Sequence, residues 1–188
     1  MVLEGSEQEL VAACRRGDPE AFRELFETYK DKIYSVALRF AGDPAAAMDI
    51  AQDTFVKLFS SIRDFRGDSA FETWVYRVVA NRCLDRRRKY GRLIPMAQEF
   101  IATLRSPDNA LAGLLEAEMR GRVRSAVSRL RPDLRIVVAL RYSQGMSYDQ
   151  IGEVLGISSG TVASRLFRAH KKLERSLAHF VQREGGHV

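Results

Sequence analysis

The side chains best suited to binding chemistry in this chain lie between residues 159 and 172. Apart from one aromatic ring they are small, polar or basic, and they are Ser159, Thr161, Ala163, Ser164, Arg165, Phe167, Arg168, Lys171 and Lys172. Small residues near the N-terminal end of a helix allow close approach to a major groove, and basic residues reach phosphates. The pattern favours a helix that binds double-stranded DNA.

The residues before this helix predict a second, shorter helix and a glycine turn that position it. Residues 147–150 (Ser-Tyr-Asp-Gln) fit a capping box, Gly156 can end the short helix that follows, and Ser158 can cap the next one. The expected inward positions are Ile151, Val154 and Leu155 in the first helix and Val162, Leu166 and Ala169 in the second. Gly152 is small where the two helices would approach each other. We predict a helix-turn-helix; an ordinary helical hairpin with a solvated basic face is the alternative.

A second candidate site combines a polar loop with a basic helix. The loop is Phe65, Arg66, Gly67, Asp68, Ser69 and Ala70, and the following helix adds Arg77, Asn81 and Arg88 on the side opposite Trp74. Aromatic rings can stack on unpaired bases, amides can read base edges, and guanidinium groups can hold the backbone. The set favours single-stranded nucleic acid, whereas a plain connector is the alternative. Phe71 and Trp74 are assigned to the core.

A third candidate surface is acidic. Asp49, Gln52 and Asp53 are spaced by three and four residues, so they share one face of a helix, and Phe55 and Leu58 face the other way. On a basic protein such a face suits a partner protein of complementary positive charge. A solvated acidic face is the alternative.

Catalysis and metal binding have little support. Cys14 and Cys83 are far apart and have no metal-ligand spacing. The histidines, His170, His179 and His187, all lie near the C-terminal end, away from any plausible triad. We therefore predict no catalytic residue, no metal and no cofactor.

Helical periodicity runs through almost the whole chain and predicts an all-α fold of two small helical domains joined by a flexible linker. Helix starts are expected at Asp18-Pro19, Asp43-Pro44, the capping box Ser69–Glu72, and Arg131-Pro132. Periodicity weakens after Lys89 and returns near Leu114. The predicted domains are 1–90 and 113–184, and the linker is 91–112 with one helical turn near residues 96–104.

The composition is typical of a globular protein, and the excess of positive charge suggests a polyanionic binding partner. Of 188 residues 46% are hydrophobic, the net charge is +6 and the pI is about 9.6. Two cysteines indicate a reducing cytoplasm, and the first ten residues do not fit a signal peptide. The aliphatic runs are too short to span a bilayer.

Four blocks, taken in order, carry a resemblance to a known family: DPEAFRELFETYKDKIYSVALRFAGD, DIAQDTFVKLF, FRGDSAFETWVYRVVANRCLDRRRK and GMSYDQIGEVLGISSGTVASRLFRAHKKL. Together they resemble an extracytoplasmic-function (ECF, group 4) type sigma factor of the sigma-70 family. The resemblance implies a DNA-binding specificity subunit of bacterial RNA polymerase, not an enzyme. It implies core RNA polymerase and promoter DNA as partners, together with an anti-sigma factor or other regulatory protein, and no membrane insertion.

The resemblance also implies roles for the three candidate surfaces. Region 2, residues 1–90, would bind core polymerase through Asp49, Gln52, Asp53, Phe55 and Leu58. It would recognise and melt the −10 element with Phe65 to Ala70, Arg77, Asn81 and Arg88. Region 4, residues 113–184, would read the −35 element with the set between Ser159 and Lys172. Two residues depart from the family pattern. Similar proteins often carry Lys or Arg at the position of Ala163, and Ala is common at the position of Gly152.

Two other classes remain open on sequence grounds. A helix-turn-helix repressor or activator with a helical sensor domain explains the C-terminal half equally well but leaves the acidic face and the polar loop unexplained. A serine recombinase needs a nucleophilic serine in a catalytic domain that contains β-strands, and the N-terminal half has only helical patterns.

Overall fold

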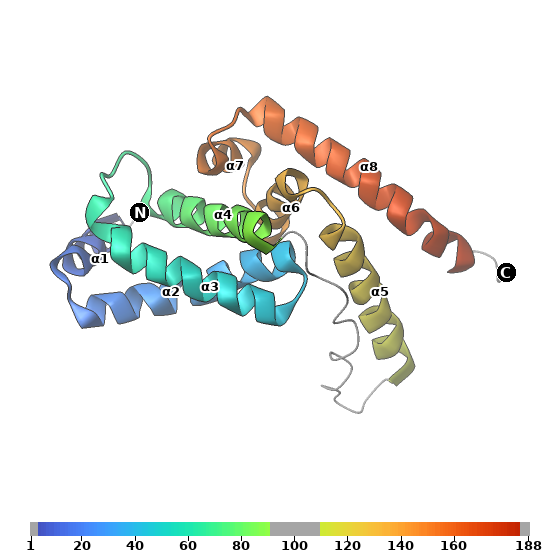
Figure 1. Ribbon diagram of the computed structural model, residues 1–188, viewed down its shortest axis with the longest axis horizontal. Helices are drawn as coiled ribbons and strands as arrows, with labels where there is room; N and C mark the ends of the chain where they lie inside the picture. The colour runs from blue at the N-terminus through green and yellow to red at the C-terminus, as the bar shows by residue number, and fades with distance from the viewer. Residues whose placement is uncertain (1–3, 91–109, 185–188) are drawn as a thin grey trace.

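The computed structural model describes residues 4–90 and 110–184, with side chains for 7–85 and 119–178. Within these ranges the chain is helical throughout, as predicted (Figure 1). The elements are α1 (Glu4–Arg16), α2 (Pro19–Ala41), α3 (Pro44–Ser61), the 3₁₀ helix η1 (Ile62–Asp64), α4 (Phe71–Tyr90), α5 (Ala110–Ser128), α6 (Pro132–Gln144), α7 (Tyr148–Leu155) and α8 (Ser159–Glu184). The linker expected at 91–112, with its helical turn, lies largely outside the described residues. α5 nevertheless begins inside the predicted linker, at Ala110.

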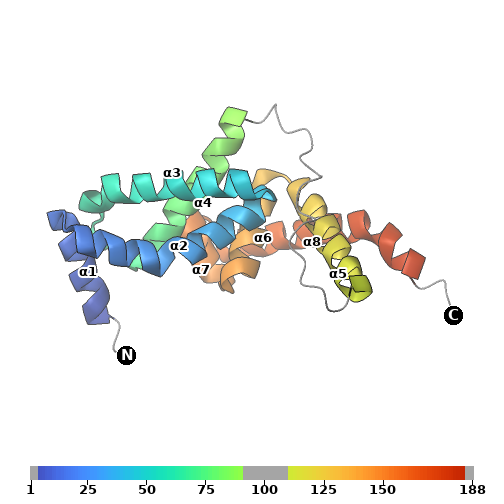
Figure 2. The ribbon, with the colours of Figure 1, turned by 90° about the horizontal axis from the view of Figure 1, so that it is seen from below.

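The predicted helix-start signals, an aspartate followed by a proline, set where α2 and α3 begin. The Asp18 carboxylate accepts from the Glu20 amide at 2.9 Å, and the Asp43 carboxylate accepts from the Ala46 amide at 2.7 Å. Each is followed by a proline, whose missing N–H is not needed in the first turn. Figure 2 shows α2 and α3 side by side, with α4 crossing them.

The start of α4 differs from the prediction. The Ala70 carbonyl accepts from the Trp74 amide at 3.1 Å, so the helix begins at Phe71 and the capping box expected from Ser69 is wrong by one residue. The physical reason lies in the aromatic packing at this corner. The rings of Phe65 and Phe71 meet edge to face at 5.3 Å, which fixes where the chain enters the helix.

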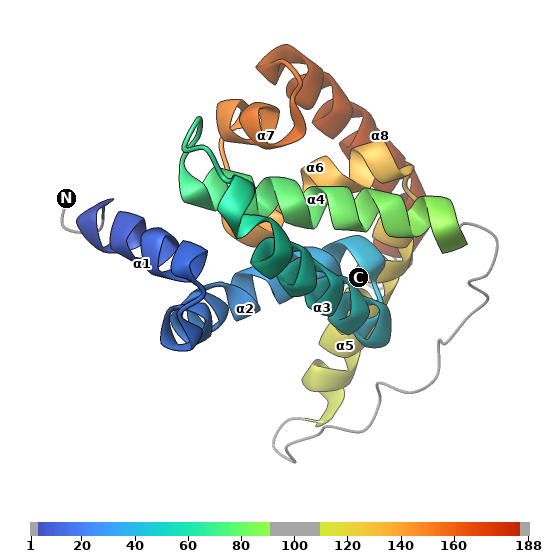
Figure 3. The same cartoon turned by 60° about the vertical axis from the view of Figure 1, so that its left-hand side comes forward.

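Helix α6 is covered by helices from both halves of the chain. Its residues from Leu134 to Leu140 are all buried, including Arg135. A helix that is buried on all sides must be covered by several neighbours. α6 packs against α8 on its own side and against α2 and α4 of the N-terminal domain (Figures 1 and 3). The two predicted domains therefore share one continuous hydrophobic core in this structure.

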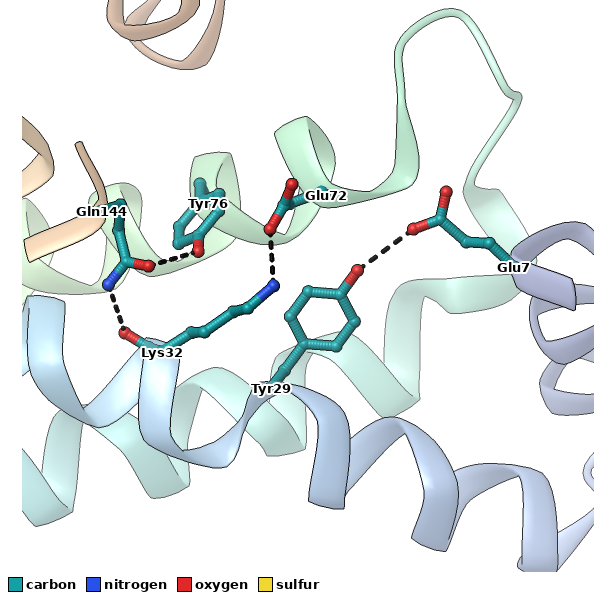
Figure 4. A network of polar contacts seen from close by, with 6 residues as sticks. All are labelled: Glu7, Tyr29, Lys32, Glu72, Tyr76 and Gln144. Atoms are coloured by element: carbon teal, nitrogen blue, oxygen red, sulfur yellow. Dashed lines mark hydrogen bonds and ion pairs between the residues drawn. The ribbon is translucent and has the colours of Figure 1, made fainter. Parts of the chain in front are cut away.

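Polar contacts tie the two domains together at the end of α6. The Gln144 amide donates to the Lys32 carbonyl at 3.3 Å and accepts from the Tyr76 hydroxyl at 2.7 Å (Figure 4). On the same side, the Lys32 ammonium pairs with Glu72 at 2.8 Å. Burial, followed by the nearby Glu72 charge, raises the pKa of the Tyr76 hydroxyl, which therefore remains a donor to Gln144.

No helix among the described residues is both long enough and apolar enough to cross a membrane.

Candidate functional site

The helix-turn-helix predicted from the sequence is present in α7 and α8. The Ser147 hydroxyl accepts from the Gln150 amide at 3.2 Å, while the Gln150 side chain accepts from the Ser147 amide at 2.8 Å, so the capping box is confirmed. Gly156 ends α7 in the left-handed conformation, with φ of 65°. The Ser158 hydroxyl then accepts from the Thr161 amide at 3.2 Å and caps α8.

Gly152 allows α7 and the turn after it to approach closely. A Cβ atom at this position would lie 2.7 Å from the Ile157 carbonyl oxygen. The Ile157 amide in turn donates to the Gly152 carbonyl at 3.0 Å, which holds the turn against the helix. The sequence predicted a close approach at Gly152, and the structure agrees. An alanine here would force the backbone of the turn to shift.

The inward and outward faces of α8 are separated as predicted. Val162, Leu166 and Ala169 are buried against the rest of the domain. Of the candidate DNA-binding residues, Ser159, Ser164, Phe167, Arg168, Lys171 and Lys172 are exposed, and Thr161, Ala163 and Arg165 are half-buried.

Two local contacts order the outward side chains of α8. The Arg168 guanidinium donates to the Ser164 carbonyl at 3.1 Å, one turn back along the helix. The Lys171 ammonium lies 5.2 Å from the centroid of the Phe167 ring. The outward side of α8 therefore carries two cations, one of which lies beside an exposed aromatic ring. Such groups are suited to contacts with phosphates and bases.

The loop between η1 and α4 has an anchored start and an open tip. The Phe65 ring is half-buried and lies 5.3 Å from the Trp74 ring. Arg66, Gly67, Asp68 and Ala70 are exposed, and Ser69 is half-buried. Gly67 has φ of 80° with open space where a Cβ would be, so its backbone is accessible to a ligand.

The helix face beside this loop is partly occupied by the C-terminal domain. Arg77 and Asn81 are both exposed on α4, as the sequence predicted. The Arg77 guanidinium donates to the Glu153 carbonyl of α7 at 3.1 Å. The Arg88 side chain lies outside the described residues.

The acidic face predicted on α3 is present, and Phe55 and Leu58 lie on the other side of the helix, as the sequence predicted. Asp49, Gln52 and Asp53 are exposed. Phe55 and Leu58 are 7% and 0% exposed, because they pack into the core between α2, α3 and α4. In this structure they support the face from beneath, and their contact with polymerase stays a prediction.

Sequence reasoning missed the exposed apolar residues of α3. Met48 is 59% exposed and Val56 is 64% exposed. Together with Gln52 they are spaced by four residues, so they form one stripe along the helix. That spacing was readable in the sequence, but only burial shows that these apolar side chains point outward.

The two cysteines are buried and unpaired. Burial raises the pKa of the Cys14 thiol to about 11 and that of Cys83 to about 12. For Cys83, burial outweighs the nearby Arg135 charge, which acts in the opposite direction. Across the described residues, no group of three or more His, Cys, Asp or Glu side chains could hold a metal ion.

Comparison with known proteins agrees with this geometry. The family model described as Sigma-70 region 2 matches residues 25–93, and the one described as Sigma-70, region 4 matches residues 120–173. Together they cover more than half of the chain. The chain belongs to the sigma-70 family. It is an alternative sigma factor of the ECF type and directs promoter-specific transcription initiation by RNA polymerase.

Relatives of this sigma factor match over nearly their full length. The RNA polymerase sigma-H factor of Pseudomonas aeruginosa is 34% identical over 189 residues, which cover 94% of this chain and 96% of the relative. The ECF RNA polymerase sigma-E factor of Haemophilus influenzae is 31% identical, over 92% of this chain and 95% of the relative. Members of the family are DNA-binding specificity subunits. The region 2 match contains the acidic face of α3 and the loop before α4, and the region 4 match contains the outward face of α8.

Two solved structures have a similar fold. CnrH, determined in complex with the cytosolic domain of CnrY, has a TM-score of 0.65 and 27% identity, covering 90% of this sigma factor and 96% of that chain. The sigma factor RpoE of Bartonella quintana, in complex with the anti-sigma factor NepR, has a TM-score of 0.64 and 21% identity, covering 84% and 96%. The second likeness concerns the fold alone.

Proposed function

We propose that this sigma factor reads the −35 element with α8, captures melted −10 bases with the loop before α4, and binds core polymerase through α3. The observation that carries this proposal is the two-sided character of α8. A buried stripe of Val162, Leu166 and Ala169 fixes the helix, and the opposite side presents Ser164, Arg168 and Lys171 to solvent. This is the arrangement that a recognition helix needs in a major groove.

The loop before α4 has the parts required for base capture. A base is read on its Watson–Crick edge only after it leaves the stack, and unstacking costs a few kcal/mol. Phe65 supplies an apolar wall, Gly67 allows close backbone approach, and Asp68 offers a short hydrogen-bonding side chain. Arg77 and Asn81 on α4 would hold the displaced strand. Because the exposed Arg77 side chain is bonded to the Glu153 carbonyl in this structure, its use by DNA requires that this hydrogen bond break.

The polymerase contact is assigned to the exposed side of α3. Asp49, Gln52 and Asp53 supply charge and hydrogen-bonding groups, and Met48 and Val56 supply apolar area. Protein interfaces combine an apolar centre with a polar rim, and this face has both components. Phe55 and Leu58 set the orientation of the helix from the core.

Regulation and location follow from the same assignment. An anti-sigma factor or other regulatory protein is the proposed controlling partner, and complexes of this kind are known for the fold. The site of action is the cytoplasm, where polymerase and promoter DNA are found. The polymerase supplies the catalysis, and this chain supplies only promoter choice and opening.

The test is a loop exchange in the full chain. Arg66–Ala70 is replaced by a Gly/Ser segment of equal length, and a promoter found by run-off transcription with core polymerase serves as the template. Permanganate reactivity of thymines then reports strand separation at the −10 element. We expect retained core binding, retained −35 contact and lost melting. Normal melting by the exchanged protein would show that the loop is only a connector.

A further inference from the structure

Helix α1 contributes a side chain to the base-capture loop, although the region 2 family match begins only at residue 25. The Arg15 guanidinium donates to the Phe65 carbonyl, and its Nε donates to the Ile62 carbonyl at 3.5 Å. The two carbonyls lie close together because the Phe65 amide itself donates to Ile62 at 3.3 Å. One cation therefore binds both ends of the tight turn that starts the loop.

Arginine suits this position for a chemical reason. Its planar guanidinium carries five N–H donors in a fixed fork and accepts nothing, so it can bind two carbonyl oxygens at once. Hydrogen bonds from a charged donor are stronger than those between neutral groups. The Phe65 ring, which follows this turn, lies against Phe71 and Trp74 at 5.3 Å from each.

Arg15 is exposed, but the helix that carries it is anchored. Val11 and Cys14 of α1 are buried in the core, and the Tyr29 hydroxyl of α2 donates to Glu7 at 3.1 Å (Figure 4). Gly17 ends α1 in the left-handed conformation, with its amide donating to the Cys14 carbonyl at 2.9 Å. The guanidinium thus reaches the loop from an anchored helix.

We propose that Arg15 is a positioning residue for promoter opening, which fixes the Phe65 turn so that the loop is already shaped to receive an unstacked base. This inference rests on the proposed function of the loop. A loop that must be ordered during binding loses part of its interaction energy to that ordering, whereas a preformed loop does not. Melting is the step that is sensitive to this loss, because the captured base must offset the unstacking of the duplex.

The experiment compares three variants of the full chain with the wild type. Arg15→Ala removes both donors, Arg15→Lys retains the charge and donors for one carbonyl, and Arg16→Ala removes an exposed neighbouring charge that donates to neither carbonyl. Each is assayed for core binding, −35 duplex binding and permanganate reactivity at −10. Because Trp74 is the only tryptophan, acrylamide quenching of its fluorescence reports whether Phe65 still covers it.

We expect Arg15→Ala to reduce −10 opening by about tenfold, the factor for the loss of one net hydrogen bond, and to raise Trp74 quenching. Arg15→Lys should lie between Arg15→Ala and the wild type. Arg16→Ala should match the wild type, and core and −35 binding should be unchanged in all three.

Distinct outcomes overturn the inference and the loop function. Normal opening by Arg15→Ala, in a preparation where the loop exchange abolishes opening, overturns the role of Arg15 and leaves the loop function intact. Normal opening by the loop exchange overturns both. An equal loss with Arg16→Ala, or a loss of opening without a change in Trp74 quenching, shows that Arg15 acts through charge and not through the position of Phe65.

Discussion

The guanidinium of Arg135 lies over the ring of Phe40, 5.2 Å from its centroid, and donates to the Phe40 carbonyl at 3.2 Å. Arg135 belongs to α6 of region 4, and Phe40 lies in the last turn of α2 of region 2. The same guanidinium donates to the Leu130 carbonyl at 2.8 Å and to Ser128. A single buried cation therefore joins the carboxyl ends of α2 and α5, where helix dipoles favour positive charge.

Replacing Arg135 with alanine should destabilise the fold by roughly 2–4 kcal/mol, because buried carbonyls lose their charged donor. Chemical denaturation followed by circular dichroism measures this change. Arg129→Ala is the control, since Arg129 is exposed at the end of α5 and should change stability by no more than about 0.5 kcal/mol. Equal stability of the two variants would show that the carbonyls find other donors.

Gly152→Ala should weaken the helix-turn-helix even though alanine is the better helix former by about 1 kcal/mol. The added Cβ would stand 2.7 Å from a backbone oxygen, which must move, and overpacking of this kind typically costs about 1–3 kcal/mol. Gly121→Ala in α5 is the matched control, because nothing lies within 4 Å of its Cβ position, and it should be neutral or stabilising. Thermal unfolding of both variants decides between strain and propensity.

Arg165→Ala and Arg168→Ala should weaken binding to −35 duplex DNA, and at least one should flatten its salt dependence. Each phosphate contact that is lost reduces the slope of log K against log salt by about 1. Arg168 is the better candidate, since it is exposed and Arg165 is half-buried. Arg23→Ala on α2 is the control for net charge. Wild-type slopes and sequence preference in both α8 variants would remove this face from the DNA interface.

Asp53→Lys should weaken core polymerase binding without unfolding the chain, because it reverses an exposed charge on the proposed contact face of α3. Asp31→Lys makes the same reversal on an exposed position of α2 and should bind normally. Affinity is measured by pull-down or fluorescence titration with core enzyme. An unchanged affinity for Asp53→Lys would place the interface elsewhere.

Cys83 should make the folded protein less stable in alkali. Burial raises the pKa of its thiol from 9.0 to about 12, so the unfolded chain loses this proton at a lower pH than the folded chain does. The contribution of the neutral thiol is complete below pH 9 and is lost as the pH rises toward 12. The wild type should therefore lose stability relative to Cys83→Ala over this range in denaturation series at stepped pH. A constant difference would contradict the burial argument.

Local signals in the sequence predicted most of the secondary structure. The Asp-Pro pairs, the Ser147 capping box and the glycines after α6 and α7 act through neighbouring backbone groups, so their effect is visible in a short stretch of residues. The start of α4 was the exception, since the packing of Phe65 and Phe71 prevailed over the capping preference of Ser69.

The features that the sequence did not reveal depend on contacts between distant residues. Periodicity placed Phe55 and Leu58 on a different side of α3 from the acidic residues, and their burial agrees with this. The resemblance to the family assigned them to the polymerase contact, which stays a prediction. Arg15 donates to carbonyl groups of Ile62 and Phe65, which lie 47 and 50 positions further along the chain. The burial of α6 between the two domains likewise depends on packing that no single segment encodes.

Among the described residues, four hydrogen bonds between region 2 and region 4 join a side chain to a backbone carbonyl: Arg135 to Phe40, Gln144 to Lys32, Arg77 to Glu153 and Ser143 to Ser35. Every residue type offers the same carbonyl, so the accepting position can change its side chain and keep the hydrogen bond. Glu153, for example, can vary freely with respect to Arg77. At these four positions the accepting residue can change while the hydrogen bond persists, so paired substitutions would leave little record there. Coupled changes at the polar part of the interface are expected instead where two side chains meet, as at Tyr76 and Gln144.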